Sequence, residues 1–154
     1  MTTLTTHGPA LAPARLAERA QAIADRPQEW IHRVRLSADG RWYQRLHVDN
    51  EHEVWLISWL PGQATGFHDH GDANGAFAVA LGRLAEHQIA GARTVEAGQV
   101  RGFGPGYVHD VRNESTAPAV SVHVYSPPLT AMRRYDLDAD GRLVPVAIEN
   151  AEDW

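Results

Sequence analysis

The chain has 154 residues, contains no cysteine, carries a formal net charge of −5 and has arginine at all 14 of its basic positions. This length suits a single domain with a core of ordinary size. The composition excludes disulfides, thiolate metal ligands, a cysteine nucleophile and Schiff-base chemistry at lysine, and the negative charge disfavours nonspecific binding to nucleic acid.

The N-terminal part predicts a tail followed by one helix. Residues 1–10 are expected to be disordered, whereas apolar residues recur at helical spacing from Ala14 to Asp25, between Pro13 and Pro27. We expect this amphipathic helix to pack on the outside of a β domain. The early residues lack the apolar run of a secretory signal, and no segment approaches the roughly 18 apolar residues of a membrane span. The sequence therefore favours a cytoplasmic protein with no membrane partner.

From residue 41 onward, glycine and proline separate short β-rich runs. The predicted strands are at about 41–48, 53–60, 65–70, 76–81, 84–90, 93–95, 100–103, 108–112, 119–125 and 132–137. Many short strands with turn signals between them indicate a sandwich or barrel. We expect one all-β barrel domain over residues 36–154, preceded by the tail and helix in residues 1–35.

Six polar residues on or next to these strands stand out: His68, His70, His109, Ser121, His123 and Tyr125. Side chains alternate faces along a strand, so the first two point the same way, and so do the last three. All six can therefore converge inside one barrel. Imidazole suits divalent iron, copper, nickel or zinc, and three histidines without a ligating acid leave the metal's positive charge uncompensated. Such a site favours an anionic ligand.

Other interpretations of the same residues compete with this one. A His-x-His pair alone is more often a surface or hydrogen-bonded pair than a metal site. Asp69 lies between His68 and His70, faces away, and suits a structural hydrogen-bond partner. Asp72 could join His70 and His109 in a two-histidine, one-carboxylate iron site. That arrangement leaves His68 without a role. Four other histidines, at 32, 47, 52 and 87, belong to no motif and suit surface or helper roles.

The spacing of the histidines resembles the cupin motifs. Gly62, His68, His70 and Gly82 resemble the first motif, and His109 with Asn113 resembles the end of the second. Where the first motif usually has a glutamate, this chain has Asn74 and Gly75. Cupins that lack this acid but keep both histidine motifs include the thiol dioxygenases of the cysteine dioxygenase family. The resemblance implies an all-β cupin barrel, a jelly-roll-like double-stranded β-helix, with a short N-terminal helical segment.

The resemblance extends beyond the histidines, over roughly residues 41–128. Tyr43-x-Arg45 resembles the family's substrate-binding segment. Ser121-x-His123-x-Tyr125-Ser126-Pro127 resembles its outer-sphere triad and the Ser-Pro bond that is cis in relatives. Animal members also carry a cysteine that crosslinks to the tyrosine. Gly75 stands at that position, so the tyrosine is expected to act unmodified, as in many bacterial relatives.

The resemblance implies a mononuclear Fe(II) thiol dioxygenase that converts a small thiol carboxylic acid, L-cysteine first, to its sulfinic acid with O2. His68, His70 and His109 would hold the iron. Tyr125, oriented by His123 and Ser121, would donate a hydrogen bond at the reacting centre. Arg45, beside Tyr43, would hold the substrate carboxylate with its planar fork. We expect a monomer or weak homo-oligomer.

Three alternatives remain open at this point. Relatives that act on 3-mercaptopropionate use a later arginine, roughly where Arg134 lies, and replace the early arginine by glutamine. Gln44 is one residue away from that register. The chain could also be another cupin enzyme, an isomerase or a 2-oxoglutarate-type oxygenase, or a non-enzymatic cupin that senses a small molecule.

Overall fold

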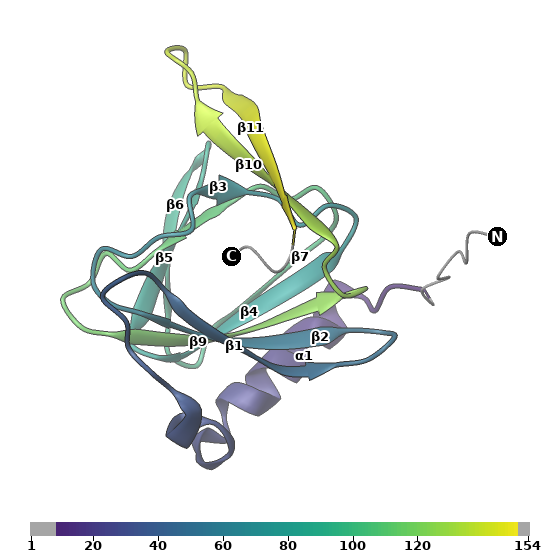
Figure 1. The fold of residues 1–154 in the computed structure, drawn as a ribbon, viewed down its shortest axis with the longest axis vertical. Helices are drawn as coiled ribbons and strands as arrows, with labels where there is room; N and C mark the ends of the chain where they lie inside the picture. The colour runs from purple at the N-terminus through teal and green to yellow at the C-terminus, as the bar shows by residue number, and fades with distance from the viewer. Residues whose placement is uncertain (1–8, 151–154) are drawn as a thin grey trace.

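The computed structural model describes residues 9–150, in which one α-helix and two short 3₁₀ helices precede eleven strands (Figure 1). Helix α1 spans Pro13–Ala24. It starts with proline, whose missing N–H leaves no hydrogen bond unmade at a helix N-terminus. The buried side chains Leu16, Ala20 and Ala24 face the β domain. The predicted helix is thus confirmed, and it is followed by η1 (Pro27–Glu29) and η2 (Ile31–Arg33).

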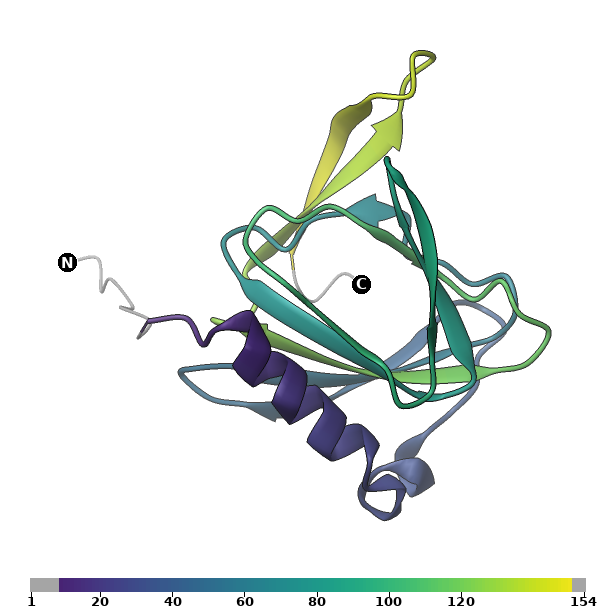
Figure 2. The same cartoon turned by 180° about the vertical axis from the view of Figure 1, so that it is seen from behind.

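A five-stranded sheet forms one wall of the molecule. Its order is β1 (Trp42–Val48), β2 (Glu53–Trp59), β9 (Ala119–Ser126), β4 (Asn74–Leu81) and β7 (Val100–Phe103). Strands β2 and β9 are buried along their whole length because both faces of the sheet are covered. Helix α1 lies along the outer face, as the view from behind shows (Figure 2).

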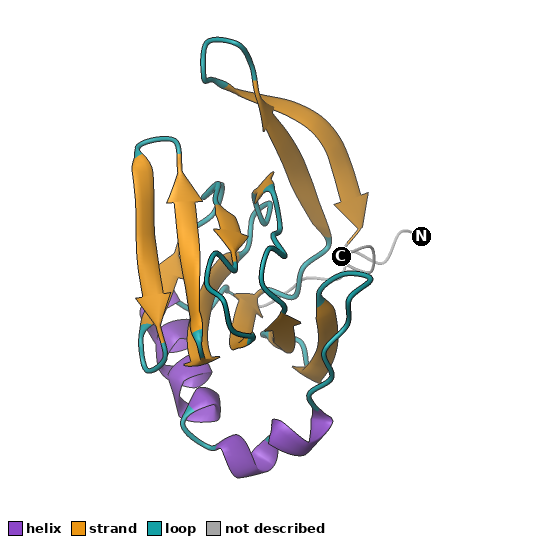
Figure 3. Ribbon diagram, turned by 90° about the vertical axis from the view of Figure 1, so that its left-hand side faces the viewer, coloured by secondary structure: helices purple, strands orange, loops and turns teal. Residues whose placement is uncertain are grey.

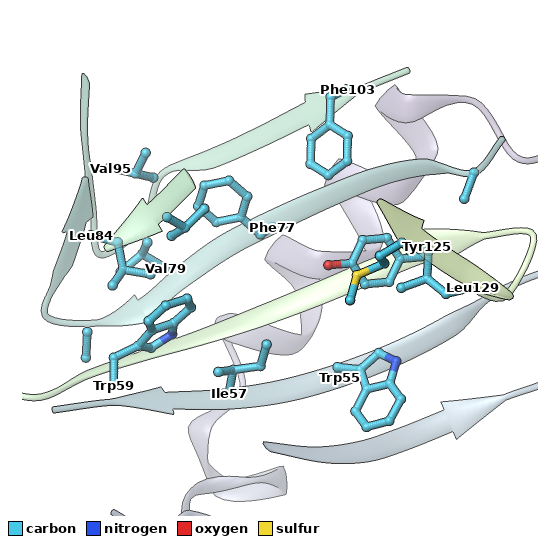
Figure 4. Packing of buried hydrophobic residues seen from close by; sticks show 14 residues of the cluster. Trp55, Ile57, Trp59, Phe77, Val79, Leu84, Val95, Phe103, Tyr125 and Leu129 are labelled. Atoms are coloured by element: carbon cyan, nitrogen blue, oxygen red, sulfur yellow. The ribbon is translucent and has the colours of Figure 1, made fainter. Parts of the chain in front are cut away.

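Alternation along β2 divides the core into two clusters. Trp55, Ile57 and Trp59 point into the interior with Phe77 and Tyr125 (Figure 4). Their neighbours of opposite parity pack instead against α1. The interior of the molecule is therefore lined by one face of the five-stranded sheet, and the predicted functional residues of β9 lie on that face.

Two three-stranded sheets complete the fold. One has the order β6 (Gly91–Glu96), β5 (Arg83–Gln88), β8 (Asp110–Arg112), and the other has the order β11 (Leu143–Asn150), β10 (Ala131–Leu137), β3 (Phe67–His68). Isolated bridges pair His68 with His109 and Ala64 with Arg112, and so connect β3 to β8. The first bridge joins two of the predicted metal ligands through their backbones.

The structure differs from the sequence prediction mainly at two strands. Strand β3 is shorter than the predicted run 65–70, so His70 lies just beyond it. Strand β11 was not predicted, because Pro145 interrupts its pattern. This proline is tolerated on an edge strand, at the register shift opposite Arg134 and Tyr135. Figure 3 shows the hairpin of β10 and β11 extending from the body of the molecule.

Two further predictions concern the ends of the chain and membranes. The disorder expected for residues 1–10 falls almost entirely outside the described residues. Within the described part of the chain, no helix has the length and apolar character needed to cross a membrane.

Candidate metal centre

Three buried histidines, His68, His70 and His109, meet inside the molecule. Their ligand-type nitrogen atoms lie within 4.8 Å of one another, and their ring centroids are 4.8 to 5.1 Å apart. Two reciprocal backbone hydrogen bonds, of 3.0 and 3.1 Å, join His68 to His109. The backbone N–H of Asp69 donates to Arg133 O at 3.0 Å, which joins the segment between His68 and His70 to β10 beyond the end of β3.

The tautomers of two histidines follow from their neighbours. His68 Nδ1 lies 2.9 Å from Gly66 O, and His109 Nδ1 lies 2.9 Å from a carboxylate oxygen of Glu86. Both oxygens are acceptors, so both Nδ1 atoms carry the proton and donate. The lone pair of a neutral ring is then on Nε2. His68 and His109 therefore each present an Nε2 lone pair as a metal ligand.

His70 provides the observation that tests whether a metal fits. Its ring lies against Phe103 and Tyr125, with centroid distances of 4.8 and 5.0 Å. Both of its nitrogens are buried, and neither has a hydrogen-bond partner among residues 9–150. An unpartnered buried polar atom is costly, and coordination to a metal removes that cost. Burial also lowers the pKa of His70 well below its usual value, so the ring is neutral. The three donors fit a divalent transition metal.

Glu86 supports the cluster from strand β5 and was not predicted from the sequence. Its buried carboxylate accepts hydrogen bonds from His109, from Arg101 Nε at 3.0 Å and from Tyr107 OH at 3.2 Å. Burial alone would raise the pKa of Glu86, but the bonds from His109 and Arg101 outweigh it and lower the pKa. A carboxylate behind a ligating histidine fixes the ring and increases its basicity. Sequence spacing could not indicate Glu86, because a single glutamate on a strand forms no motif.

A chain of polar side chains leads from the core to Tyr125. Trp59 Nε1 donates to Ser121 Oγ at 2.8 Å, Ser121 Oγ lies 2.7 Å from His123 Nε2, and Tyr125 OH lies 3.4 Å from His123 Nδ1. Because indole can only donate, the hydroxyl hydrogen of Ser121 is directed to His123 Nε2. His123 then carries its proton on Nδ1, facing the tyrosine oxygen. The structure thus joins the three predicted residues and adds Trp59, which belongs to no motif of the sequence.

The two titratable groups of this relay, His123 and Tyr125, are both held neutral. Burial lowers the pKa of His123 to about 3. Burial and the neighbouring Glu53 raise the pKa of Tyr125. The tyrosine therefore keeps its proton and remains a hydrogen-bond donor at neutral pH.

Arg45 and Tyr43 lie on the face of β1 that points to the interior of the molecule. The Arg45 side chain is 47% exposed, and its NH1 lies 3.7 Å from a carboxylate oxygen of Glu53. Its guanidinium also lies 5.6 Å from the centroid of Trp55, against whose ring Tyr43 packs edge-on. Two contacts thus hold Arg45: an ion pair with Glu53 that is longer than a hydrogen bond, and the ring of Trp55.

Arg134 and Arg41 are the other arginines close to the histidines. Arg134 Nε donates to Glu149 at 2.8 Å, and its NH1 donates to Thr65 O. In the β3–β10 ladder Arg134 is directly paired with His68. Arg41, which was not predicted, lies over Trp59 at 5.2 Å, and burial together with Arg134 lowers its pKa to about 10.

Three further positions bear on the sequence predictions. Asp69 is buried and accepts hydrogen bonds from Gly71 N, Arg133 N and Tyr135 OH, which confirms it as a structural partner. Asp72 is exposed and outside the histidine cluster, which disfavours the two-histidine, one-carboxylate alternative. The Ser126–Pro127 peptide bond is cis, as the resemblance implied.

Comparisons with known proteins give a family and a fold. A profile described as "Cysteine dioxygenase type I" matches residues 14–138. Cysteine dioxygenase type 1 of Danio rerio is 26% identical over 134 residues, and that of Bos taurus is 28% identical over 133 residues. Each match covers 75% of this chain and 66% of the relative, so the chain spans slightly less than two thirds of these proteins.

Solved structures with low sequence identity share the architecture. A protein with a double-stranded β-helix domain from Klebsiella pneumoniae has a TM-score of 0.59 and 22% identity, over 76% of this chain and 93% of that one. A sugar phosphate isomerase of the cupin superfamily from Silicibacter pomeroyi has a TM-score of 0.57 and 22% identity, over 75% and 79% of the two chains. These likenesses confirm the predicted cupin fold.

Proposed function

The chain belongs to the cysteine dioxygenase type I family, and on this premise we propose that it is a mononuclear Fe(II) thiol dioxygenase. Its substrates would be O2 and a small thiol carboxylic acid, L-cysteine first, and its product the sulfinic acid. The observation that carries the proposal is the buried group of His68, His70 and His109, in which both His70 nitrogens have no hydrogen-bond partner among the described residues.

The iron would be held by Nε2 of His68, Nε2 of His109 and one ring nitrogen of His70. When bound there, Fe(II) supplies the redox chemistry with O2 and the charge that favours a substrate thiolate. Burial keeps the imidazoles of His68 and His70 neutral, and the protein orients those of His68 and His109 through Gly66 O and Glu86. Glu86 lies behind His109 and would not itself be a ligand, so an anionic substrate would not face a ligating carboxylate.

Tyr125 would act as the hydrogen-bond donor beside the metal. Its ring stacks on His70, which places it next to the proposed ligands. The relay through Ser121 and His123 directs an N–H at the tyrosine oxygen, and the tyrosine would donate its own hydrogen to the reacting atoms. A donor fixed before the reaction stabilises developing charge without reorganisation. The surrounding apolar rings keep water away from this position.

The substrate carboxylate would bind Arg45, beside Tyr43. Arginine holds a carboxylate with two parallel hydrogen bonds, and the single long contact to Glu53 leaves most of the Arg45 fork for a ligand. The alternative, 3-mercaptopropionate dioxygenase, is favoured by one observation. Arg134 is paired with His68 across β3 and β10, so a carboxylate held there would also lie near the histidines.

The proposal is tested by O2 uptake and sulfinate formation with the Fe(II)-loaded protein and a panel of cysteine, 3-mercaptopropionate and cysteamine. We expect thiol-dependent uptake that His70→Ala abolishes together with iron retention. His87→Ala serves as the matched control, because His87 is paired with Glu114 away from the site. Tyr125→Phe should keep its iron and lose on the order of 10–1000-fold in turnover. Absence of thiol-dependent uptake in iron-loaded protein would refute the proposal.

A further inference from the structure

A second group of ligand-type side chains lies at the turn between β1 and β2. Ligand atoms of His47, Asp49 and His52 are all within 4.8 Å of one another. His47 is directly opposite Val54, whose side chain packs in the cluster that includes α1. The group therefore lies on the outer face of the five-stranded sheet, where the β1–β2 turn comes close to α1 (Figure 2). The three histidines described above lie on the other side of that sheet.

Local backbone geometry assembles this group before any ligand binds. A register shift between Arg45 and His47 turns the His47 ring to the outer face. Asp49 Oδ1 accepts the backbone N–H groups of Glu51 at 2.8 Å and His52 at 3.0 Å, and Asp49 N donates to His52 O at 3.1 Å. The other carboxylate oxygen of Asp49 lies 2.8 Å from His47 Nε2. The carboxylate is thus fixed between the two rings.

His52 has ring nitrogens that the protein itself does not satisfy. Its side chain is only 13% exposed, and its Nδ1 is 3.4 Å from Asp49 Oδ1 without forming a hydrogen bond. Neither ring nitrogen has a hydrogen-bond partner within the described part of the chain. Its ring lies 4.8 Å from that of His47. An imidazole with two buried and unsatisfied nitrogens is unfavourable, and a cation bound at Nδ1 would satisfy one of them.

The protonation states suit a cation. Burial lowers the pKa of His52 despite the nearby Asp49, so the ring is neutral with a lone pair to offer. The hydrogen bond from His47 lowers the pKa of Asp49, which is therefore ionised. A cation that binds His47 Nε2 would replace the hydrogen through which this atom contacts Asp49. Arg19 of α1 and the carboxylate of Glu51 both lie near the His52 ring, and their charges oppose and favour a bound cation respectively.

We propose that His47, Asp49 and His52 form a second metal site, which takes a late first-row divalent cation such as Zn(II). Two imidazoles and one carboxylate match the ligand preferences of Zn(II), Ni(II) and Cu(II). Mg²⁺ and Ca²⁺ are disfavoured because they require mainly oxygen ligands. His47 and Asp49 are 39% and 44% exposed, so the remaining coordination positions face water and the cation exchanges readily. A bound cation would fix the β1–β2 turn.

The site is tested by measuring how many Zn(II) ions bind to each chain of the iron-loaded protein. Equilibrium dialysis should find one Zn(II) per chain beyond the iron. His52→Gln and Asp49→Asn should each weaken this binding by on the order of tenfold or more, since even outer partners of a ligand have effects of that size. Asn keeps an oxygen for the two backbone N–H groups, so this variant removes charge while preserving the turn. Iron content and thiol oxidation should not change in either variant.

Two controls separate the second site from the first and from ordinary surface pairs. His87→Gln removes a histidine whose Nε2 lies 2.6 Å from Glu114 but which has no third ligand residue beside it among residues 9–150, and it should leave the Zn(II) count unchanged. In His70→Ala protein, which lacks the first centre, one Zn(II) should still bind. Cu(II) bound to that variant should show hyperfine coupling to two imidazole nitrogens. Failure of wild-type protein to bind Zn(II) beyond its iron, or binding that survives His52→Gln undiminished, would overturn the proposal.

Discussion

The two candidate carboxylate-binding arginines differ in what a substrate must displace. Arg134 donates one hydrogen bond to Glu149 and one to the backbone oxygen of Thr65, and its side chain is only 20% exposed. Recruiting it would break both bonds. Arg45 has a single charged contact of 3.7 Å, which is longer than a hydrogen bond. A substrate carboxylate can therefore bind Arg45 at lower cost.

This difference predicts which substitution changes substrate preference. Arg45→Ala should reduce the preference for cysteine over cysteamine, which lacks the carboxylate, by on the order of 10- to 100-fold in kcat/KM. A hydrogen bond to a charged group contributes roughly 1.5–3 kcal/mol. Arg134→Ala, the matched control, should change this ratio little. If 3-mercaptopropionate is the better substrate and Arg134→Ala is the damaging change, the mercaptopropionate alternative is correct.

The sequence could indicate a functional residue only where its spacing from other residues formed a motif. His68 and His70 were placed on one face by parity alone. Their rings do meet although β3 ends at His68, and Asp69 N bonds to Arg133 O just beyond that end. Trp59 and Glu86 belong to no short motif. Their roles arise from the sheet register and from the packing of β5 behind His109, which the order of residues in the chain does not reveal.

Among the elements, β5 matters because it fixes one ligand. Glu86 is on β5 and His109 precedes β8, and the two strands pair in register. Glu86→Gln should keep an oxygen for His109 Nδ1 but remove its charge. We expect metal affinity to fall by about 10–100-fold. Competition with a chelator, using Co(II) or Fe(II), measures it. Glu96→Gln, at an exposed position of β6, is the control, and equal affinities in the two variants would contradict the role of Glu86.

Strand β4 explains why the tyrosine has no cysteine neighbour. Gly75 of β4 is paired with Tyr125 on β9 and with Phe103 on β7. A Cβ atom at Gly75 would lie 2.4 Å from Phe103 Cε2 and 3.0 Å from Tyr125 Cδ1. The ring of Phe103 thus takes the space that a cysteine side chain needs.

Gly75→Cys should therefore lower the free energy of unfolding by about 1–3 kcal/mol, the usual cost of overpacking a core. Urea unfolding measures the change. Gly104→Cys is the control, because its nearest neighbour would be 3.9 Å away. Adding Phe103→Leu to Gly75→Cys should recover part of the loss, and no recovery would show that the contact with Phe103 is not its cause.

At the scale of the whole molecule, one five-stranded sheet and two three-stranded sheets surround the polar site, and α1 covers the outside. This much followed from turn spacing, alternation and the amphipathic N-terminal segment. The pairing of β3 with β8 and β10, and the addition of β11 as an edge strand, did not follow, because short strands are held by tertiary contacts more than by their own sequence. The enclosure has an energetic consequence, since it buries several histidines in their neutral form.

The metal-free protein should therefore lose stability as pH falls below about 6.5, the usual pKa of histidine in an unfolded chain. Burial lowers the pKa of His123 to about 3 and those of His68 and His70 well below 6.5. Between the folded and unfolded values the unfolded state binds more protons, so the free energy of unfolding rises with pH there and levels off above 6.5. Each such histidine contributes a slope of up to about 1.4 kcal/mol per pH unit. Urea unfolding at pH 7.5, 6.5, 5.5 and 4.5 measures this slope.

His123→Gln isolates the contribution of the histidine that is outside the proposed ligand set. Between pH 6.5 and 4.5, the slope of the free energy of unfolding against pH should be smaller in this variant by the contribution of one proton. His32→Gln, at an exposed position, should leave the slope unchanged. The same enclosure that keeps the rings neutral for a metal therefore makes the empty site sensitive to acid. A stability that stays level or rises as the metal-free protein is acidified through this range would show that the histidines are not held neutral by burial.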